Sequence, residues 1–491
     1  MKKIIFKSFL AASTALVLLS GCKKFEDFGD RNVNPNGTTV PVTSALLTQA
    51  EIQLGDYAGR LTNMRIRPGL YVQYFSETQY TDVSLYNLPQ IDFGGIYAGP
   101  IKDLQNIIDV NSNPATSGTA LLNGANENQI GIAKILKSYY IWGITDAWGD
   151  VPYSDALSGN PYPKYDKQED IYKGMIADLK SAVTSMNASA TPVIKGDVIY
   201  AGNIAKWKKL ANSMRMLMAL RLSKVYPAAG GYAQVEFAAA AADAAGSISV
   251  NADNFIITYP GGSFNNPYYS LLTGRKDYGE AKTYVDILTA LGDNRLTVTG
   301  TSTVAADAFP YGLKRDQAVL FEAAHPNYPQ VLAASQRTSS SPFTMISASF
   351  VLFARAEAAE RGWTSENAAT LYAQAVQLSF ERWGLTLPSG YMSNASVTYV
   401  VGDQAGNLMR IAIQRYIDLY PDGAQAWAEW RRTGFPVLTP TPNATNTSKQ
   451  IPRRYVYGLN EFSLNPASLA EAIARLAGGD TQDSRVWWDK P

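Results

Sequence analysis

Apolar residues recur at helical spacing in several long segments, and this pattern constrains the fold of the chain most strongly. One apolar face carries Ile132, Leu136, Tyr140 and Ile144. Residues four positions apart lie on the same face of a helix, so we expect a helix that ends near Trp148-Gly149. A second helix is predicted from about Gln168 to Met186. Prolines between the two helices, up to Pro163, predict a loop because they cannot continue a helix.

The same arrangement of helix, loop and helix recurs three more times. The further pairs are expected at Ile204–Val225 with Val235–Ala245, at Ser347–Glu360 with Ala368–Trp383, and at Asn407–Leu419 with Gln425–Thr433. The pair that begins at Ser347 sets small residues beside large ones, namely Ala354, Ala356, Ala358, Ala359, Tyr372, Ala373 and Ala375. Such a pattern suits the close packing of tetratricopeptide-type helix pairs. We therefore predict a mostly α fold with a helical-repeat scaffold. A generic helical bundle is the alternative, because the repeat is irregular.

Four other segments lack helical periodicity and are rich in Gly, Pro, Asn, Ser and aromatic residues. These segments are Tyr74–Pro100, Asn251–Lys276, Thr297–Gln330 and Pro436–Leu464. We expect loops here, inserted into the helical frame, and loops on a rigid frame often carry binding residues. The sequence thus predicts a single domain over residues 42–491, with a loop-rich binding region around residues 74–100, 251–330 and 436–464.

The first 41 residues indicate export and a lipid anchor. Basic residues at positions 2, 3 and 7 precede an apolar run, Phe9–Leu19, that is too short to span a bilayer. The run ends in Leu19-Ser20-Gly21-Cys22, the small-residue pattern that lipoprotein signal peptidase cuts before a lipidated cysteine. We predict a signal peptide over residues 1–21, lipidation of Cys22, and a tether over residues 22–41. The turn-forming Asn34-Pro35-Asn36-Gly37 lies within this tether.

Several classes of chemistry find little support in the composition. The chain has 43 basic and 42 acidic residues, with no basic cluster that would bind phosphates, so we expect no nucleic-acid partner. His325 is the only histidine and Cys22 the only cysteine, which argues against a zinc site or a Ser/His/Asp triad. We predict no metal and no cofactor. Glycoside hydrolysis needs only two carboxylates, so composition leaves a glycosidase open.

Aromatic residues interleaved with hydrogen-bonding residues are the strongest candidates for ligand contacts. The candidate residues are Tyr80, Asp82, Tyr86, Asn87, Phe264, Asn265, Tyr268 and Tyr269. Aromatic faces stack on the flat C–H faces of sugar rings, while amides and carboxylates bind the hydroxyls at the rim. This composition suits a glycan platform. The alternative for each residue is a packing role, in which the side chain holds its loop onto the scaffold.

Several motifs together resemble the SusD/RagB-like family of nutrient-binding outer-membrane lipoproteins of Bacteroidetes, in particular its SusD-like branch. Those before the middle of the chain are the lipobox ending in Cys22, Asn34-Pro35-Asn36, Gln79-Tyr80-Thr81-Asp82, Ile96-Tyr97-Ala98-Gly99-Pro100-Ile101-Lys102-Asp103-Leu104 and Trp148-Gly149-Asp150-Val151-Pro152-Tyr153-Ser154-Asp155-Ala156. Those after it are Arg355-Ala356-Glu357-Ala358, Pro452-Arg453-Arg454 and Val486-Trp487-Trp488-Asp489. The resemblance implies tetratricopeptide-like helix pairs in a right-handed superhelical scaffold, with a loop-rich ligand region.

The resemblance also implies a location and a partner. A member of this family would be anchored in the outer membrane facing the cell exterior, where it would dock over a SusC-like TonB-dependent transporter. It would capture oligosaccharide and deliver it for uptake, without breaking a bond. An oligopeptide ligand is the runner-up, since the family includes peptide binders. A surface glycosidase and a purely structural repeat scaffold that recruits other proteins are the rivals from other classes.

Overall fold

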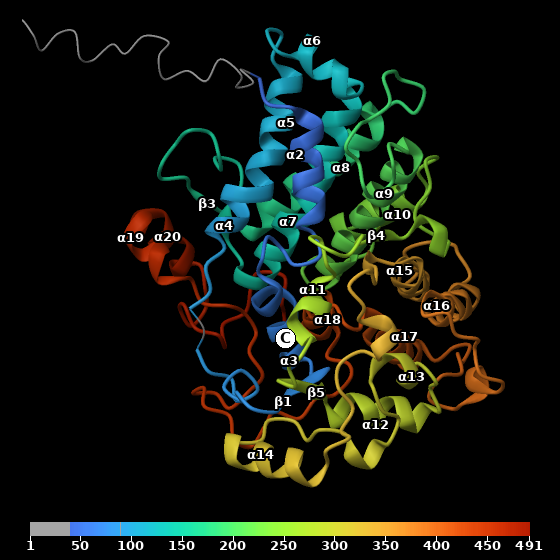
Figure 1. Cartoon of the computed structure of the whole chain (residues 1–491). Coiled ribbons are helices and arrows are strands. Elements are labelled where there is room, and N and C mark those ends of the chain that lie inside the picture. Colours follow the sequence, from blue (N-terminus) through green and yellow to red (C-terminus); the bar gives the residue numbers. More distant parts are fainter. Residues whose placement is uncertain (1–39, 89) are drawn as a thin grey trace, which may run out of the picture. The chain divides into compact units, whose positions relative to one another are not determined.

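A computed structural model describes residues 40–88 and 90–491 of the chain. One compact unit, Thr43–Pro491, contains all the described helices and strands (Figure 1). The predictions for the signal peptide, for Cys22 and for most of the tether lie outside the described residues. Within the described residues, no helix has both the length and the apolar character that crossing a membrane requires.

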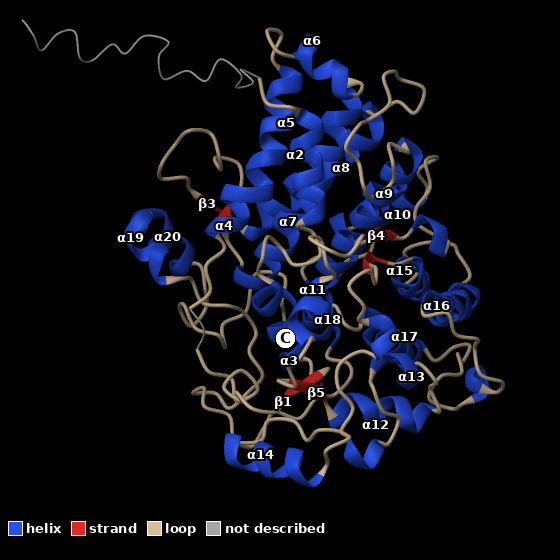
Figure 2. Cartoon of the chain, in the orientation of Figure 1, coloured by secondary structure: helices blue, strands red, loops and turns tan. Residues whose placement is uncertain are grey.

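The unit is mostly helical (Figure 2). Its first half contains α2 (Thr43–Ile52), η3 (Thr62–Ile66), α3 (Arg67–Tyr71), α4 (Gly94–Ile96), η4 (Tyr97–Ile101), α5 (Lys102–Ser112), α6 (Ser117–Ala120), η5 (Leu121–Asn123), α7 (Asn126–Trp148), α8 (Gln168–Ser185), α9 (Ile204–Arg221), η6 (Leu222–Lys224) and α10 (Tyr232–Ala241). The second half contains η7 (Asn251–Asp253), α11 (Pro267–Leu272), α12 (Lys282–Leu291), α13 (Leu296–Thr299), η8 (Ala305–Asp307), α14 (Arg315–Ala324), η9 (Ala334–Gln336), α15 (Ala348–Glu360), α16 (Ala368–Arg382), η10 (Tyr391–Ser393), α17 (Gln404–Leu419), α18 (Gly423–Thr433), α19 (Leu459–Leu464) and α20 (Pro466–Ala474).

The four predicted helix pairs are confirmed. α7 packs against α8, α9 against α10, α15 against α16, and α17 against α18. Neighbouring pairs also touch, since α8 contacts α9 and α15 contacts α17. The long helix α7 buries Trp142, Trp148 and most of its other side chains, because it has neighbours on several sides. The mostly α fold class is therefore correct.

The prediction that the four other segments are loops is wrong in part. Helix α14 lies inside the segment predicted as a loop at residues 297–330, and its only buried residue is Ala318. A helix that buries one small side chain has no broad apolar stripe, so its periodicity is hard to detect in the sequence. Likewise, α4 and η4 occupy the end of the segment 74–100, α11 lies within 251–276, and α19 closes the segment 436–464.

The described part of the chain contains three short antiparallel strand pairs, two of which connect distant segments. β1 (Phe75–Glu77) pairs with β5 (Tyr278–Glu280), β2 (Val151–Pro152) with β3 (Tyr165–Asp166), and β4 (Phe255–Ile257) with β6 (Phe343–Ile346). In the first pair Phe75 lies opposite Glu280, and Glu77 lies opposite Tyr278. The loop that leaves β1 therefore lies beside the loop that enters β5, and two of the predicted binding segments come together.

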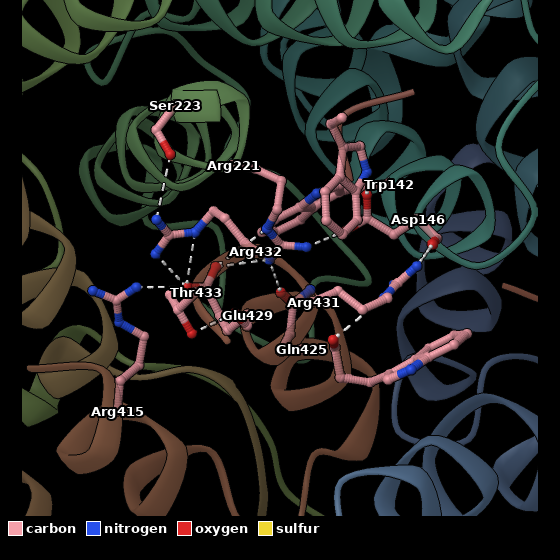
Figure 3. A network of polar contacts seen from close by, with 12 residues as sticks. Trp142, Asp146, Arg221, Ser223, Arg415, Gln425, Glu429, Arg431, Arg432 and Thr433 are labelled. Atoms are coloured by element: carbon pink, nitrogen blue, oxygen red, sulfur yellow. Dashed lines mark hydrogen bonds and ion pairs between the residues drawn. The ribbon is translucent and has the colours of Figure 1, made fainter. Parts of the chain in front are cut away.

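A buried ionic network joins five helices in the interior, and Figure 3 shows the part of it around Glu429 and Arg432. The nitrogens of Arg432 lie 2.7 Å from carboxylate oxygens of Glu357 and Glu429, and Arg415 reaches Glu357 at 2.6 Å. Arg221 on α9 links Glu429 at 3.0 Å to Asp146 on α7 at 2.5 Å. Burial alone would raise the pKa of Glu357, but Arg432 and Arg415 hold this pKa well below its usual value. The network thus connects both halves of the chain, and each of these three arginines pairs with at least one carboxylate.

Two of the sequence motifs, the one that begins at Trp148 and the one that begins at Val486, contain residues that pack in the interior. Trp148 donates a hydrogen bond from Nε1 to the carbonyl of Val456 at 3.0 Å, and Trp488 donates to Asp146 Oδ1 at 2.8 Å. Both tryptophans are fully buried. The C-terminal segment is thereby fixed against the end of α7.

Candidate ligand-binding site

The loop after β1 carries the first candidate residues. The Tyr80 side chain is 63% exposed, and the guanidinium carbon of Arg315 on α14 lies 6.0 Å from its ring centroid. Asp82 is also exposed. At the base of the loop, Glu77 Oε2 accepts a hydrogen bond from the backbone N–H of Ser84 at 2.8 Å. Burial raises the pKa of Glu77 to about 7. This carboxyl group fixes the loop that presents Tyr80 and Asp82.

Tyr86 and Asn87 hold the same loop onto the scaffold. The Tyr86 ring has no exposed surface and meets the Tyr71 ring edge-on, at a centroid distance of 6.3 Å. Its hydroxyl oxygen accepts a hydrogen bond from the backbone N–H of Thr441 at 3.3 Å. Asn87 Oδ1 accepts a hydrogen bond from Arg67 at 3.2 Å. The structure therefore does not support Tyr86 as a ligand contact, because a buried ring cannot stack on a sugar. Asn87 is half-buried and already paired.

Phe264 and Asn265 line a hollow of about 480 Å³ beside the N-terminal helix of the unit. We call it the Phe264 hollow, and its polar lining includes Gln49, Gln53, Asp56, Tyr259, Asn265 and Ser270. The Phe264 side chain is 52% exposed. The Tyr259 hydroxyl is buried and has no hydrogen-bond partner among the described residues. An exposed aromatic ring and several polar side chains thus share one concave surface.

Helix α11 separates this hollow from a second one. Asn266 starts the helix, because its side chain accepts a hydrogen bond from the backbone N–H of Tyr268 at 2.8 Å, and Pro267 follows at the first helical position. Tyr268 is buried, stacks on Phe343 at a centroid distance of 5.7 Å, and donates its hydroxyl to the carbonyl of Pro421 at 2.9 Å. It anchors the helix, so the structure does not support Tyr268 as a ligand contact either.

Tyr269, the next residue, lines the second hollow, which measures about 460 Å³. We call it the Tyr269 hollow; its lining includes Leu272, Arg275, Lys276, Gln330 and Arg337. The Lys276 carbonyl accepts a hydrogen bond from Tyr328 at 2.9 Å, and Thr78 donates from its backbone N–H to Asp277 O at 3.0 Å. This loop therefore adjoins the Tyr80 loop through the strand pair β1–β5.

The structure thus places the eight candidates in four settings. Tyr80 and Asp82 lie on the exposed loop, Phe264 and Asn265 line one hollow, and Tyr269 lines the other. The remaining three, Tyr86, Asn87 and Tyr268, hold their segments onto the scaffold. Sequence reasoning missed Gln49, Gln53, Asp56, Arg275, Lys276 and Arg337. The glutamines and Asp56 follow a spacing of four and three residues, a weak signal that also fits an ordinary solvated helix face.

A further cavity of about 400 Å³ lies where Gly149-Asp150 meets Trp487 and Asp489. Its walls are formed by the segment that follows α7 and by the C-terminal segment that packs against it. Asp150 accepts a backbone hydrogen bond from Gln168 at 2.8 Å, and Asp489 pairs with Arg453 at 2.8 Å. Its polar groups are engaged in holding the chain together, so we do not place the ligand site there.

The described part of the chain shows no cluster of metal ligands, and its histidine lies away from the two hollows. Among residues 40–88 and 90–491, no group of three or more His, Cys, Asp or Glu side chains is arranged to hold a metal ion. His325 Nδ1 lies 3.0 Å from Asp307, and its ring stacks on Phe321 at 4.1 Å. The histidine lines neither hollow.

The family of the protein follows from a match over most of its length. Residues 35–458 match a SusD-like family model described as starch-binding and associating with the outer membrane. Because this match covers most of the chain, the protein belongs to the SusD-like family. The resemblance seen in the sequence motifs is therefore confirmed.

Solved structures share the fold over the whole unit. A chitin-binding protein is 27% identical, with a TM-score of 0.75 over 91% of this chain and 100% of its own. A SusD homolog from Bacteroides uniformis is 25% identical, with a TM-score of 0.79 over 92% of this chain and 99% of its own. A chitin-binding SusD homolog from Flavobacterium johnsoniae is 23% identical, with a TM-score of 0.77 over 91% of this chain and 98% of its own. No curated protein sequence matches this chain.

Proposed function

We propose that this protein is a lipid-anchored surface subunit of an importer that captures oligosaccharide and delivers it to a SusC-like TonB-dependent transporter. The observation that carries the proposal is the half-exposed Phe264 ring on a hollow lined by amides, hydroxyls and one carboxyl group. Sugar rings present C–H faces for an aromatic ring and hydroxyls for amides. The family description as starch-binding supports the same ligand class.

The proposed contacts follow from exposure. Phe264 would stack on a sugar ring, and Asn265, Gln49 and Gln53 would bind its hydroxyl groups. Tyr80 and Asp82 on the neighbouring loop, with Tyr269 beyond α11, would extend the contact surface along a chain of several sugars. A series of shallow contacts suits a ligand that must be released to a transporter.

The proposal includes no catalytic step. Hydrolysis of a glycosidic bond needs two carboxyl groups facing that bond. Among the described residues that line the two hollows, Asp56 supplies the only carboxyl group. Binding without cleavage is therefore the function that this site supports best.

The anchor and the transporter rest on the sequence and the family. A lipidated Cys22 would hold the protein on the membrane, because each buried methylene of an acyl chain contributes about 0.8 kcal/mol. The family description of association with the outer membrane agrees with an anchor there. Docking on a SusC-like transporter follows from the family resemblance.

A matched pair of phenylalanine variants tests the site. Phe462 on α19 is 46% exposed, similar to Phe264, but lines neither hollow. In calorimetric titration of the full-length protein in detergent, Phe264→Ala should weaken glycan binding about 2- to 12-fold, the worth of one aromatic contact. Phe462→Ala should leave it unchanged. Equal affinities in both variants would remove the Phe264 hollow from the site, and binding of oligopeptides alone would replace the glycan proposal.

A further inference from the structure

The Tyr269 hollow differs in charge from the Phe264 hollow. Its described lining holds three cationic side chains, Arg275, Lys276 and Arg337, and no carboxylate. The Phe264 hollow has the reverse character, since its described lining includes Asp56 and no cation. The two hollows share α11, with Pro267 and Ser270 on one and Tyr269 and Leu272 on the other.

Most of the positive charge in the Tyr269 hollow is not neutralised by the protein. Arg275 pairs with Asp277 at 2.6 Å, but the arginine side chain is 57% exposed. Lys276 is exposed and, like Arg337, forms no ion pair with a carboxylate of the described residues. In an otherwise nearly neutral chain, such a local excess of cations favours an anionic ligand.

Arg337 is the most constrained of these cations. Its guanidinium group donates hydrogen bonds to Gln330 Oε1 at 3.1 Å and to the carbonyl of Val331 at 3.4 Å, both uncharged acceptors. Burial lowers the pKa of Arg337, since this cation is partly removed from water without a counter-charge. A carboxylate or sulfate placed in the hollow would supply that counter-charge through charge-assisted hydrogen bonds.

We propose that the Tyr269 hollow is a subsite for an acidic sugar residue, one that carries a carboxylate or a sulfate group. The inference rests on the proposed function as a glycan-binding protein and narrows its ligand class. Tyr269 would contact the ring of the acidic sugar, and Arg337 and Lys276 would bind its anionic group. A neutral residue of the same glycan would occupy the Phe264 hollow across α11.

Matched pairs of glycans test this subsite. Full-length protein in detergent is titrated at low salt with oligouronides of several linkages and with their carboxyl-reduced forms, which differ only at the acidic group. Sulfated oligosaccharides and their desulfated forms make a second set. The acidic member of at least one pair should bind about tenfold more tightly, and added salt should reduce this preference. A preference among the oligouronide pairs would identify the anionic group as a carboxylate, and a preference among the sulfated pairs would identify it as a sulfate.

Variants then assign the preference to the hollow. Arg337→Gln and Lys276→Gln should each remove most of the preference for the acidic glycan while neutral binding persists. Lys180→Gln, at an exposed lysine on α8, should retain it. Equal binding of acidic and neutral members, or a preference that both variants retain, would overturn the inference. That result would leave the proposed function intact, whereas failure of every glycan to bind would refute the proposed function itself.

Discussion

Two tyrosines of one loop should respond in opposite ways to replacement by alanine. The Tyr86 ring is fully buried, and its hydroxyl accepts a hydrogen bond from Thr441. Removing a buried aromatic side chain costs about 3–5 kcal/mol. Unfolding entropy is about 2.1 cal/mol/K per residue, so over the roughly 450 residues of Thr43–Pro491 this loss lowers the Tm by about 3–5 °C. The Tm of Tyr86→Ala should therefore lie several degrees below that of the wild type.

Tyr80→Ala should leave stability within about 0.5 kcal/mol, because this side chain is 63% exposed. It should instead weaken glycan binding about 2- to 12-fold, if Tyr80 contacts the ligand as proposed. Scanning calorimetry and titration of both variants provide the two measurements. Unchanged melting of Tyr86→Ala, together with lost binding, would refute the division of the loop into a presented and a packed aromatic residue.

Three further predictions concern buried charge and the anchor. Glu357→Gln should destabilise the protein by about 3–5 kcal/mol in chemical denaturation, because Arg415 and Arg432 would stay buried with half their partners lost. Burial raises the pKa of Glu280 to about 8, and neither carboxyl oxygen has a partner among the described residues. Its folded-state pKa exceeds the unfolded value, so the wild type should lose stability relative to Glu280→Gln as the pH rises from about 4.5 to about 8. A stability difference between the two proteins that stays constant over this pH range would contradict the raised pKa of Glu280. Cys22→Ser should move the protein from the membrane to the soluble fraction; retention in the membrane pellet would exclude the anchor.

The helix pairs were predictable because their cores bury long apolar faces. α7, α9 and α15 each bury most of their residues. Burial of a helix requires apolar side chains at regular intervals, and these intervals can be detected in the sequence. α14 was missed because only Ala318 is buried there. The buried ionic network was also missed, since the sequence does not show which of many Arg and Glu side chains meet in the interior.

The candidate site was predictable as a region and less so residue by residue. Tyr80 and Tyr86 lie six positions apart with similar neighbours, yet one is exposed and the other buried. The difference arises from the turn that ends at Tyr86, which adopts a φ of 63°, and from the contacts of Tyr86 with Tyr71 and with Thr441, which is 355 positions away in the sequence. Such contacts depend on tertiary structure, so alternating aromatic and polar residues could not reveal them.

The proposed function is tested most directly by a binding screen of the full-length protein in detergent against panels of oligosaccharides and oligopeptides, with product analysis of every hit. We expect saturable binding of at least one oligosaccharide that is recovered intact. Cleaved products would contradict the proposal of binding without catalysis, and hits among peptides only would contradict the glycan assignment.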